Sequence, residues 1–573
     1  MTHQAPYVAL VSLGSVLWLA ACDSGGSAPA DLVLRGGAVL TMDAERPEAR
    51  AIAVADGRIV WIGDDAEAQG WIGDNTEVQE IGGGLLLPGF QDAHIHPVSG
   101  GAELGECDLN AMADAKSVLA KIAECADADP GSIWLRGGGF QLPHFTGGSP
   151  TAAMLDAIES TRPVWLTSAD GHSAWVNTAA LEVAGVTALT QDPPLGRIER
   201  DPRTGAPTGT LREAAMDLVG RHVPKRSPEQ LTEGLRRALA LASSFGITAL
   251  QEASAGRDEL EAYAALRDSN ELTARVSISL WVDPRRGLEQ VADLAALQGE
   301  FDADGLRVET VKLFADGVIE GQTAALLEPY SGRGNFRGEL NFEPEALTAL
   351  VTALDAEGFQ VHVHAIGDRA IRVTLDAFEE ARRLNGARDA RHHIAHAQLI
   401  DPADVPRFQE LGVAVNFQPL WAWADSYITD LTEPVLGPAR SRWLYPIHSM
   451  AAAGSRVVFG SDWSVSTMNP LPGIEVAVTR SDPESSAQQP WIPEERIDLA
   501  TALAAYTSGS AWVNFLDHET GSIEVGKAAD LVLLERDLRR VPPTEIGDVE
   551  VVRTILAGQT VFSAPKTQRV RAE

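Results

Sequence analysis

Six side chains that can bind a metal ion or carry a proton stand near the C-terminal ends of apolar, β-branched runs. In chain order they are His94, His96, Lys312, His364, His396 and Asp462. Active sites of parallel-strand barrels form at the carboxyl ends of the strands. Imidazole and carboxylate groups bind divalent metals, so side chains gathered at that end would hold one or two such ions. The sequence therefore predicts a metal site built from distant segments of the chain.

The stretch around His94 and His96 is the most specific local signal. Residues two apart on a strand face the same side, so the two imidazoles point together and Asp92 shares their face. Neutral imidazole suits zinc in particular. A His-x-His pair also occurs in strands that bind no metal, so the pair needs the other side chains to define a site.

Eight apolar segments are predicted as the strands that position these side chains. They are residues 85–96, 247–252, 275–282, 308–315, 360–365, 392–397, 413–418 and 457–461. Most are separated by segments of helical composition, such as residues 343–358. Strands alternating with helices predict an α/β fold with a parallel sheet, and eight strands predict a closed (β/α)8 TIM-like barrel over residues 85–517.

The rest of the chain divides around this barrel. Residues 31–84 and 518–565 contain short strands and glycine turns, including an Asp56-Gly57 hairpin signal, and we expect the two chain ends to form one small β-domain. The gap between the first two barrel strands is too long for one βα unit, so residues 97–245 hold an insertion. Insertions after barrel strands overhang the active site, so this one is expected to shape the substrate pocket.

Composition excludes some classes of function. The 573 residues are 45% hydrophobic and 22% charged, as in an ordinary globular enzyme. A net charge of −34 argues against a nucleic-acid partner, because the phosphate backbone would be repelled. No internal stretch is long and apolar enough to span a bilayer. A small-molecule substrate is the expected partner, and a homo-oligomer stays open.

Residues 1–29 are predicted to be a lipoprotein-type signal peptide and tether. An apolar stretch of about 15 residues ends in Leu-Ala-Ala-Cys22, which resembles a bacterial lipobox and predicts lipidation of Cys22. The protein is then expected at the bacterial cell envelope, anchored by lipid on the periplasmic side. The first six residues contain no Lys or Arg, unlike most signal peptides. A plain secretory peptide with a secreted product, or a spurious leader, therefore stays open.

The two other cysteines are Cys107 and Cys125. An oxidising compartment would permit a disulfide between them, and two buried free thiols are the alternative. Neither is expected to bind a metal, because no further Cys or His stands at zinc-site spacing.

Several stretches, in the right order, carry a resemblance to a known family. They are FQDAHIHP from Phe90, DGHSAWVN from Asp170, VKLFADG from Val311, VHVHAIGDR from Val361, IAHAQ from Ile394, FGSDW from Phe459 and GSIEVGKAADL from Gly521. This pattern resembles the amidohydrolase superfamily, in the branch called amidohydrolase family 3 or YtcJ-like. The resemblance covers nearly the whole chain after residue 31. It implies a metal-dependent barrel with a β-sandwich built from both chain ends.

The resemblance also implies roles for the predicted ligands. His94 and His96 would hold the more buried metal, and His364 and His396 the second. Lys312 would be carboxylated on its amine and bridge the two metals, since an unmodified ammonium has only donors. A lysine that snorkels or pairs with Asp316 is the alternative. Asp462 would bind metal and shuttle protons as the catalytic carboxylate, although a helix-capping role stays open.

Weaker expectations concern the surroundings of the site. His362 faces the same side as His364 but one layer deeper, so it is expected to be structural. Relatives often carry Glu where this chain has Ala395, so an acid that would orient a ligand is missing. Predicted substrate-binding residues, with ordinary packing as the alternative, are His172, Trp175 and Asn177 from the insertion, and Gln418, Trp421 and Trp463 from the barrel.

The resemblance implies hydrolysis of carbon–nitrogen bonds other than peptide bonds, in amide or formamide-like substrates, by metal-activated water. A mononuclear deaminase or cyclic-amide hydrolase with unmodified Lys312 is the alternative. A non-catalytic binding lipoprotein on the same fold is a second alternative, because a fold does not establish function. The sequence does not identify which amide or formamide-like compound is the substrate.

Overall fold

The computed structural model describes residues 29–485 and 489–565. Cys22 and the predicted signal peptide lie outside the described residues, apart from the last residue of the tether. Within the described ranges, no helix combines the length and the apolar character needed to cross a membrane.

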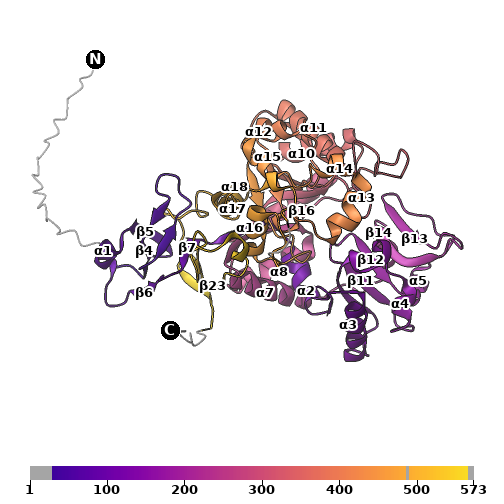
Figure 1. The fold of residues 1–573 in the computed structure, drawn as a ribbon, viewed down its shortest axis with the longest axis horizontal. Helices are drawn as coiled ribbons and strands as arrows, with labels where there is room; N and C mark the ends of the chain where they lie inside the picture. The colour runs from indigo at the N-terminus through magenta and orange to yellow at the C-terminus, as the bar shows by residue number, and fades with distance from the viewer. Residues whose placement is uncertain (1–28, 486–488, 566–573) are drawn as a thin grey trace, which may run out of the picture.

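Eight parallel strands form the central sheet and confirm the predicted barrel (Figure 1). In order around the sheet they are β8 (Phe90–Ile95), β15 (Ile247–Ala255), β16 (Arg275–Trp281), β17 (Leu306–Phe314), β18 (Gln360–Ala365), β19 (His393–His396), β20 (Ala414–Phe417) and β21 (Val457–Phe459). Hydrogen-bonded ladders join each strand to the next from β8 through to β21. This order follows the chain, as in a (β/α)8 barrel.

Helices between the strands cover the outside of the barrel. They include α7 (Pro228–Ser244), α8 (Arg257–Asp268), α9 (Gln290–Phe301), α10 (Pro344–Ala356), α11 (Asp368–Asn385) and α12 (Val405–Leu411). In α11 the buried residues Ile371, Leu375 and Phe378 recur at helical spacing, so one stripe of the helix packs on the core. Burial of such stripes holds the ring of helices against the sheet.

The predicted first barrel strand is two strands that separate at Gly89. Leu85–Pro88 forms β7, which pairs with β22 (Leu531–Leu534) in a different sheet, whereas the barrel strand β8 begins at Phe90. A Cβ on Gly89 would lie 2.2 Å from Oγ1 of Thr248, so glycine is required where the chain crosses from one sheet to the other. The single-strand prediction was wrong because it did not treat the Pro88-Gly89 pair as a break between two strands.

Both ends of the chain contribute to the part of the molecule beside the barrel. One sheet has the order β5-β4-β1-β6, and the other has the order β24-β23-β22-β7-β2-β3. The bounds are β1 (Leu32–Arg35), β2 (Ala38–Leu40), β3 (Glu48–Ala49), β4 (Ala51–Ala55), β5 (Arg58–Gly63), β6 (Glu77–Glu80), β23 (Val551–Leu556) and β24 (Gln559–Ser563). Leu34 and Ile52 from the first sheet share an apolar cluster with Leu86 and Leu533 from the second.

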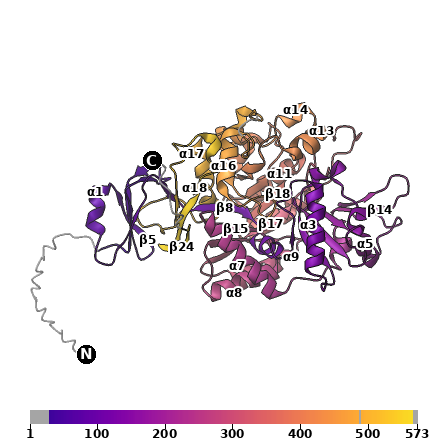
Figure 2. The ribbon, with the colours of Figure 1, turned by 60° about the horizontal axis from the view of Figure 1, so that its bottom comes forward.

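The insertion lies at the opposite end of the molecule from the two sheets built from both chain ends, which together are called the end domain (Figure 2). Its sheet has the order β13-β14-β12-β11-β10-β9, and α3 (Ala115–Ala128) packs beside it. The strands are β9 (Cys107–Asp108), β10 (Leu135–Phe140), β11 (Val164–Ser168), β12 (Ser173–Val176), β13 (Gly196–Arg200) and β14 (Pro207–Glu213). A disulfide joins Cys107 to Cys125 of α3, with their Cα atoms 5.7 Å apart.

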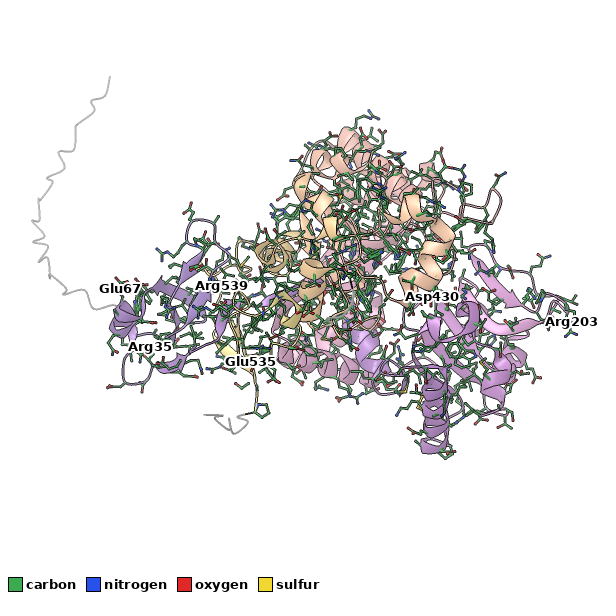
Figure 3. All side chains as sticks on the ribbon, viewed as in Figure 1. Arg35, Glu67, Arg203, Asp430, Glu535 and Arg539 are labelled. Atoms are coloured by element: carbon green, nitrogen blue, oxygen red, sulfur yellow. A yellow bond between two sulfur atoms is a disulfide. The ribbon has the colours of Figure 1, made fainter. Side chains whose placement is uncertain are left out.

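Charged side chains project from both ends of the molecule (Figure 3). Glu67 and Arg35 lie on the end domain, and Arg203 lies at the tip of the insertion (Figure 3).

Candidate metal centre

The segments that carry His94 and Asp462 are joined directly where the barrel closes. The backbone N–H of Asp462 donates to the carbonyl of His94 at 2.7 Å, and the N–H of His96 donates to the carbonyl of Trp463 at 2.8 Å. Asp92 bridges the same seam, because its carboxylate accepts from the N–H groups of both His94 and Ser461 at 3.0 Å. The first and last strands therefore place their functional side chains together.

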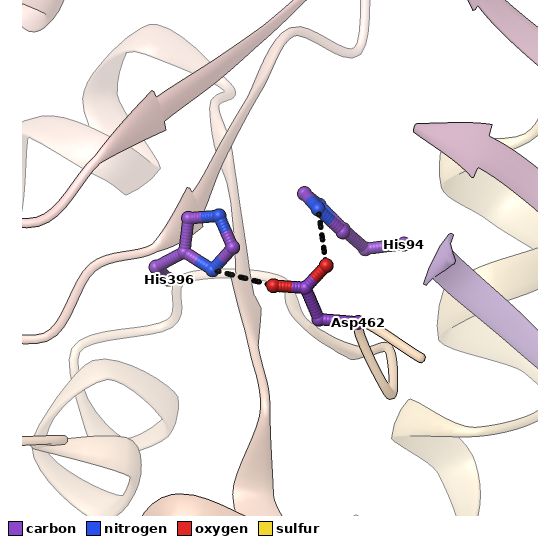
Figure 4. Close-up of side chains that lie close together, drawn as sticks. All are labelled: His94, His396 and Asp462. Carbon is purple, nitrogen blue, oxygen red and sulfur yellow. Dashed lines mark ion pairs between the residues drawn. The ribbon is translucent and has the colours of Figure 1, made fainter. Parts of the chain in front are cut away.

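Three predicted ligands form the tightest group. One oxygen of Asp462 lies 3.4 Å from Nε2 of His94, and the other lies 3.8 Å from Nδ1 of His396 (Figure 4). These three side chains are buried, and each offers one ligand atom within 4.8 Å of the others. The group thus has the size and the atom types of a metal-binding site.

The other three predicted ligands adjoin this group. Nε2 of His96 lies 3.2 Å from Asp462, and Nζ of Lys312 lies 3.3 Å from Nε2 of His94. The ring of His364 is centred 4.6 Å from the ring of His396. All six side chains therefore lie at one mouth of the barrel, although they come from five strands or strand ends.

Two of these residues adopt a backbone conformation that L-residues rarely occupy. His396 has φ of 71° and Asp462 has φ of 53°. Such left-handed conformations cost about 1–3 kcal/mol each and cluster at functional sites. His396 ends β19 and Asp462 follows β21. At each position the backbone turns so that the side chain faces the barrel mouth.

Burial sets the charges of the group. It holds the pKa values of His94, His364 and His396 well below the usual range, so these imidazoles are neutral near pH 7. Burial opposes the charge on Asp462, but the surrounding imidazoles outweigh it and hold the pKa of Asp462 well below its usual range. Neutral imidazoles and an ionised carboxylate are the forms that bind a metal, so the donor set fits a divalent ion.

The pKa values of His96 and Lys312 are shifted in opposite directions. Burial would lower the pKa of His96, but Asp462 and Glu252 more than offset this and raise it to about 9. Burial lowers the pKa of Lys312 to about 7, against smaller effects of Asp462 and Glu252. The Lys312 ammonium lies 4.7 Å from the centre of the Phe314 ring, and this ring lies beside that of His364 at an interplanar angle of 35°.

Comparison with known proteins identifies the family. The model of the amidohydrolase family matches residues 77–562. The chain belongs to the amidohydrolase family. Protein LONG AFTER FAR-RED 3 of Arabidopsis thaliana is 34% identical over 88% of this chain and 87% of its own. The N-substituted formamide deformylase of Arthrobacter pascens is 28% identical over 92% and 97%.

A solved structure agrees with this assignment. An uncharacterized metal-dependent hydrolase from Pyrococcus furiosus is 26% identical, with a TM-score of 0.67 over 88% of this chain and 99% of that one. Family membership and the donor set together make the protein a hydrolase of carbon–nitrogen bonds that uses a divalent metal.

Two predicted substrate-binding residues of this amidohydrolase have structural roles instead. Trp175 is fully buried between Phe140 and Phe145, and its Nε1 donates to the carbonyl of Thr151. Asn177 is also fully buried and caps α5 (Thr178–Ala184) by accepting from the N–H of Ala180. Its amide nitrogen donates to the carbonyls of Glu159 and Arg162. Both side chains belong to the core of the insertion.

The barrel residues predicted to bind substrate have contacts of their own around the metal centre. Gln418 is buried and accepts from Nδ1 of His396 at 2.8 Å, so it orients a ligand. Trp463 is only 6% exposed and packs on Gly100 of α2 (Pro97–Glu103). Trp421 stacks on the ring of His396 with an interplanar angle of 9°.

His172 is the residue that the insertion brings to the metal centre. Its ring is centred 5.3 Å from the ring of His364, and its Nδ1 lies 2.9 Å from Glu213. Glu213 also accepts from Thr323, in the loop after β17, at 2.6 Å. This contact fixes the insertion to the barrel at the site.

The sequence prediction missed one acidic residue of the site, Glu252, and named another, Asp316, only as a possible partner of Lys312. Glu252 lies 3.5 Å from Nδ1 of His96 and accepts from the hydroxyl of Tyr263. Its place at the carboxyl end of the second strand was a usable signal. Asp316 is not an ion-pair partner of Lys312, because its carboxylate accepts from the N–H groups of Ala325, Ile366 and Gly367. It thereby holds the loops that follow β17 and β18.

Glu252→Gln should weaken metal binding about 10–100-fold, because the carboxylate that faces His96 fixes its ring and raises its basicity. The dissociation constant for Zn²⁺, measured by competition with a chromophoric chelator, checks this. Glu519→Gln, which removes a partner of Arg275 away from the metal centre, is the matched control and should keep the parent affinity. Equal affinities of the two variants would contradict the role of Glu252.

Proposed function

We propose that this amidohydrolase cleaves a non-peptide carbon–nitrogen bond of a small amide or formamide-like substrate. The observation that carries the proposal is the buried Asp462 carboxylate, which lies within 3.2–3.8 Å of the imidazoles of His94, His96 and His396. The activity named for the Arthrobacter relative, an N-substituted formamide deformylase, supports this substrate class.

Zinc is the proposed metal, because imidazole nitrogens dominate the donor set. His94, His96 and Asp462 would hold one ion, and His364 and His396 a second. A bound metal of this kind supplies a water whose pKa falls to about 7.

The protein's own groups would then carry the proton through the reaction. Asp462 accepts a proton from the attacking water while the water oxygen forms a bond to the carbonyl carbon. The carbon–nitrogen bond breaks, and Asp462 returns the proton to the leaving nitrogen. The products are a carboxylic acid and an amine. His172, held by Glu213, is placed beside His364, where the insertion would contact the substrate.

Carboxylation of Lys312 is part of the proposal for a two-metal site. Reaction with carbon dioxide requires the neutral amine, and burial lowers the pKa of Lys312 to about 7. The carbamate that forms is an oxygen ligand, whereas the unmodified side chain has only donors. The amine of Lys312 lies 3.3 Å from Nε2 of His94, so this oxygen ligand would stand beside the proposed metal-binding histidines.

The charge near the mouth favours substrates without a carboxylate. Glu320 accepts from Gln398, two residues after His396, and Asp170 accepts from the N–H of His172. Burial, together with the nearby charge of Asp170, raises the pKa of Glu320. An anionic substrate would add a further like charge to these carboxylates. Neutral amides or amine-bearing substrates therefore suit the pocket.

We also propose that the protein is exported and anchored by a lipid on Cys22. The disulfide between Cys107 and Cys125 supports this location, because disulfides persist in oxidising compartments such as the periplasm.

Asp462→Asn should lower kcat about 10²–10⁴-fold with little change in KM, because the proton acceptor is lost while the substrate contacts remain. Steady-state kinetics on an N-substituted formamide checks this. Removal of the metal with a chelator should abolish turnover, and Zn²⁺ should restore it. A parent protein with no metal-dependent hydrolysis of amides or formamides would favour the deaminase or the binding lipoprotein instead.

Carboxylation of Lys312 should fall as the pH drops through its pKa of about 7, since the protonated amine cannot react. Metal-loaded protein equilibrated with ¹³C-bicarbonate should show a carbamate ¹³C resonance above this pH and a weaker one below it. Lys312→Met should lack the resonance. A parent with one metal per chain and no carbamate at either pH would support the mononuclear alternative.

A neutral N-substituted formamide should be hydrolysed with a kcat/KM about tenfold or more above that of an analogue bearing a carboxylate on the same substituent. The double variant Asp170→Asn, Glu320→Gln should reduce this preference. Glu67→Gln, on the end domain, is the control and should preserve it. Equal kcat/KM for both substrates in the parent would refute the charge argument.

A further inference from the structure

His362 connects the metal centre to the deeper layer of the barrel. Its Nε2 lies 2.9 Å from Nδ1 of His94, and its Nδ1 lies 3.2 Å from the hydroxyl of Ser279 on β16. Its ring stacks on His393 at a centroid distance of 3.9 Å. The side chains of His94, His362 and Ser279 are at most 1% exposed, so solvent does not compete for these hydrogen bonds.

The hydrogen-bond roles along this row depend on one another. A neutral imidazole carries one N–H, so His94 can offer a lone pair from Nε2 to a metal only if its proton is on Nδ1. That N–H then donates to Nε2 of His362. The proton of His362 must consequently be on Nδ1, where it donates to the hydroxyl oxygen of Ser279. The Ser279 hydroxyl can accept this N–H, so every group in the row is paired when Nε2 of His94 is free to bind a metal.

The opposite arrangement would disable the ligand. If His362 carried its proton on Nε2, it would donate to Nδ1 of His94 and place the His94 proton on Nε2. That N–H would face Asp462, 3.4 Å away, and could not bind a metal. The identity of the acceptor at Nδ1 of His94 therefore decides whether this ligand is ready for a metal.

We propose that His362 is a positioning residue that fixes the metal-binding tautomer of His94 through its Nε2 atom. The inference rests on the metal centre proposed above. It assigns a specific role to a residue expected to be only structural. His396 has an uncharged orienting partner as well, the amide of Gln418. Metal-ligating histidines elsewhere often donate to a carboxylate. Here two proposed ligands, His94 and His396, are oriented by neutral groups.

A pair of amide substitutions tests the proposal without an apolar change in the core. In His362→Gln the side-chain oxygen reaches the position of Nε2 and can accept from His94. In His362→Asn the shorter amide reaches only the position of Nδ1, so the bond to His94 is lost. The dissociation constant for Zn²⁺ is measured for the parent and both variants by chelator competition. His362→Asn should bind about 10–100-fold more weakly than the parent, and His362→Gln should recover most of the affinity.

His393 provides the matched control, because it is equally buried and stacks on His362 but lies outside the row from Ser279 to His94. His393→Gln and His393→Asn should bind Zn²⁺ with equal affinity. Equal affinities of His362→Gln and His362→Asn would overturn the proposal. A parent that binds no divalent metal would instead refute the metal centre itself. Should His362→Asn fail to fold, Ser279→Ala should still weaken binding severalfold relative to His362→Gln, and parent-like affinity there would also overturn the proposal.

Discussion

The seam between the first and last barrel strands is the constraint on which the site depends. A backbone hydrogen bond of 2.7 Å joins Asp462 to His94, and the carboxylate of Asp92 holds both sides of the seam. Burial raises the pKa of Asp92 to about 7, although the hydrogen bonds that it accepts oppose this shift. Keeping the carboxylate charged at the seam therefore costs free energy. Closing the barrel and assembling the centre are thus one event, because the same backbone segments do both.

The architecture and the ligand set could be predicted because they follow from period and position. Apolar runs separated by helical segments define the barrel, and side chains at strand ends converge once the strands are parallel. The crossing at Gly89 was missed because Leu85–Pro88 and Phe90–Ile95 are both fully buried and were read as one strand, although the Pro88-Gly89 pair marks the break between them. Glu252 was overlooked, although it ends the predicted second strand, because this single acid belongs to none of the quoted motifs.

The insertion shows why a sequence motif alone does not identify which of its residues reach the site. The stretch from Asp170 to Asn177 joins a turn to a strand, so neighbouring residues have different surroundings. His172 lies in the turn and reaches the metal centre, whereas Trp175 lies within β12 and fills the core of the insertion. The motif gives the residue types, but the position of each residue in the turn or in β12 determines whether its side chain faces the barrel.

The pairing of β7 with β22 makes the last tenth of the chain a support for the first ligands. Pro88 pairs with Leu531, one residue before the crossing that leads to His94 and His96. A shortened protein that ends before β22 would retain every proposed ligand. It would leave β7 with an unpaired edge that can associate with a strand of another molecule. Proteolytic trimming of the carboxyl terminus would therefore act at a distance on the imidazole pair.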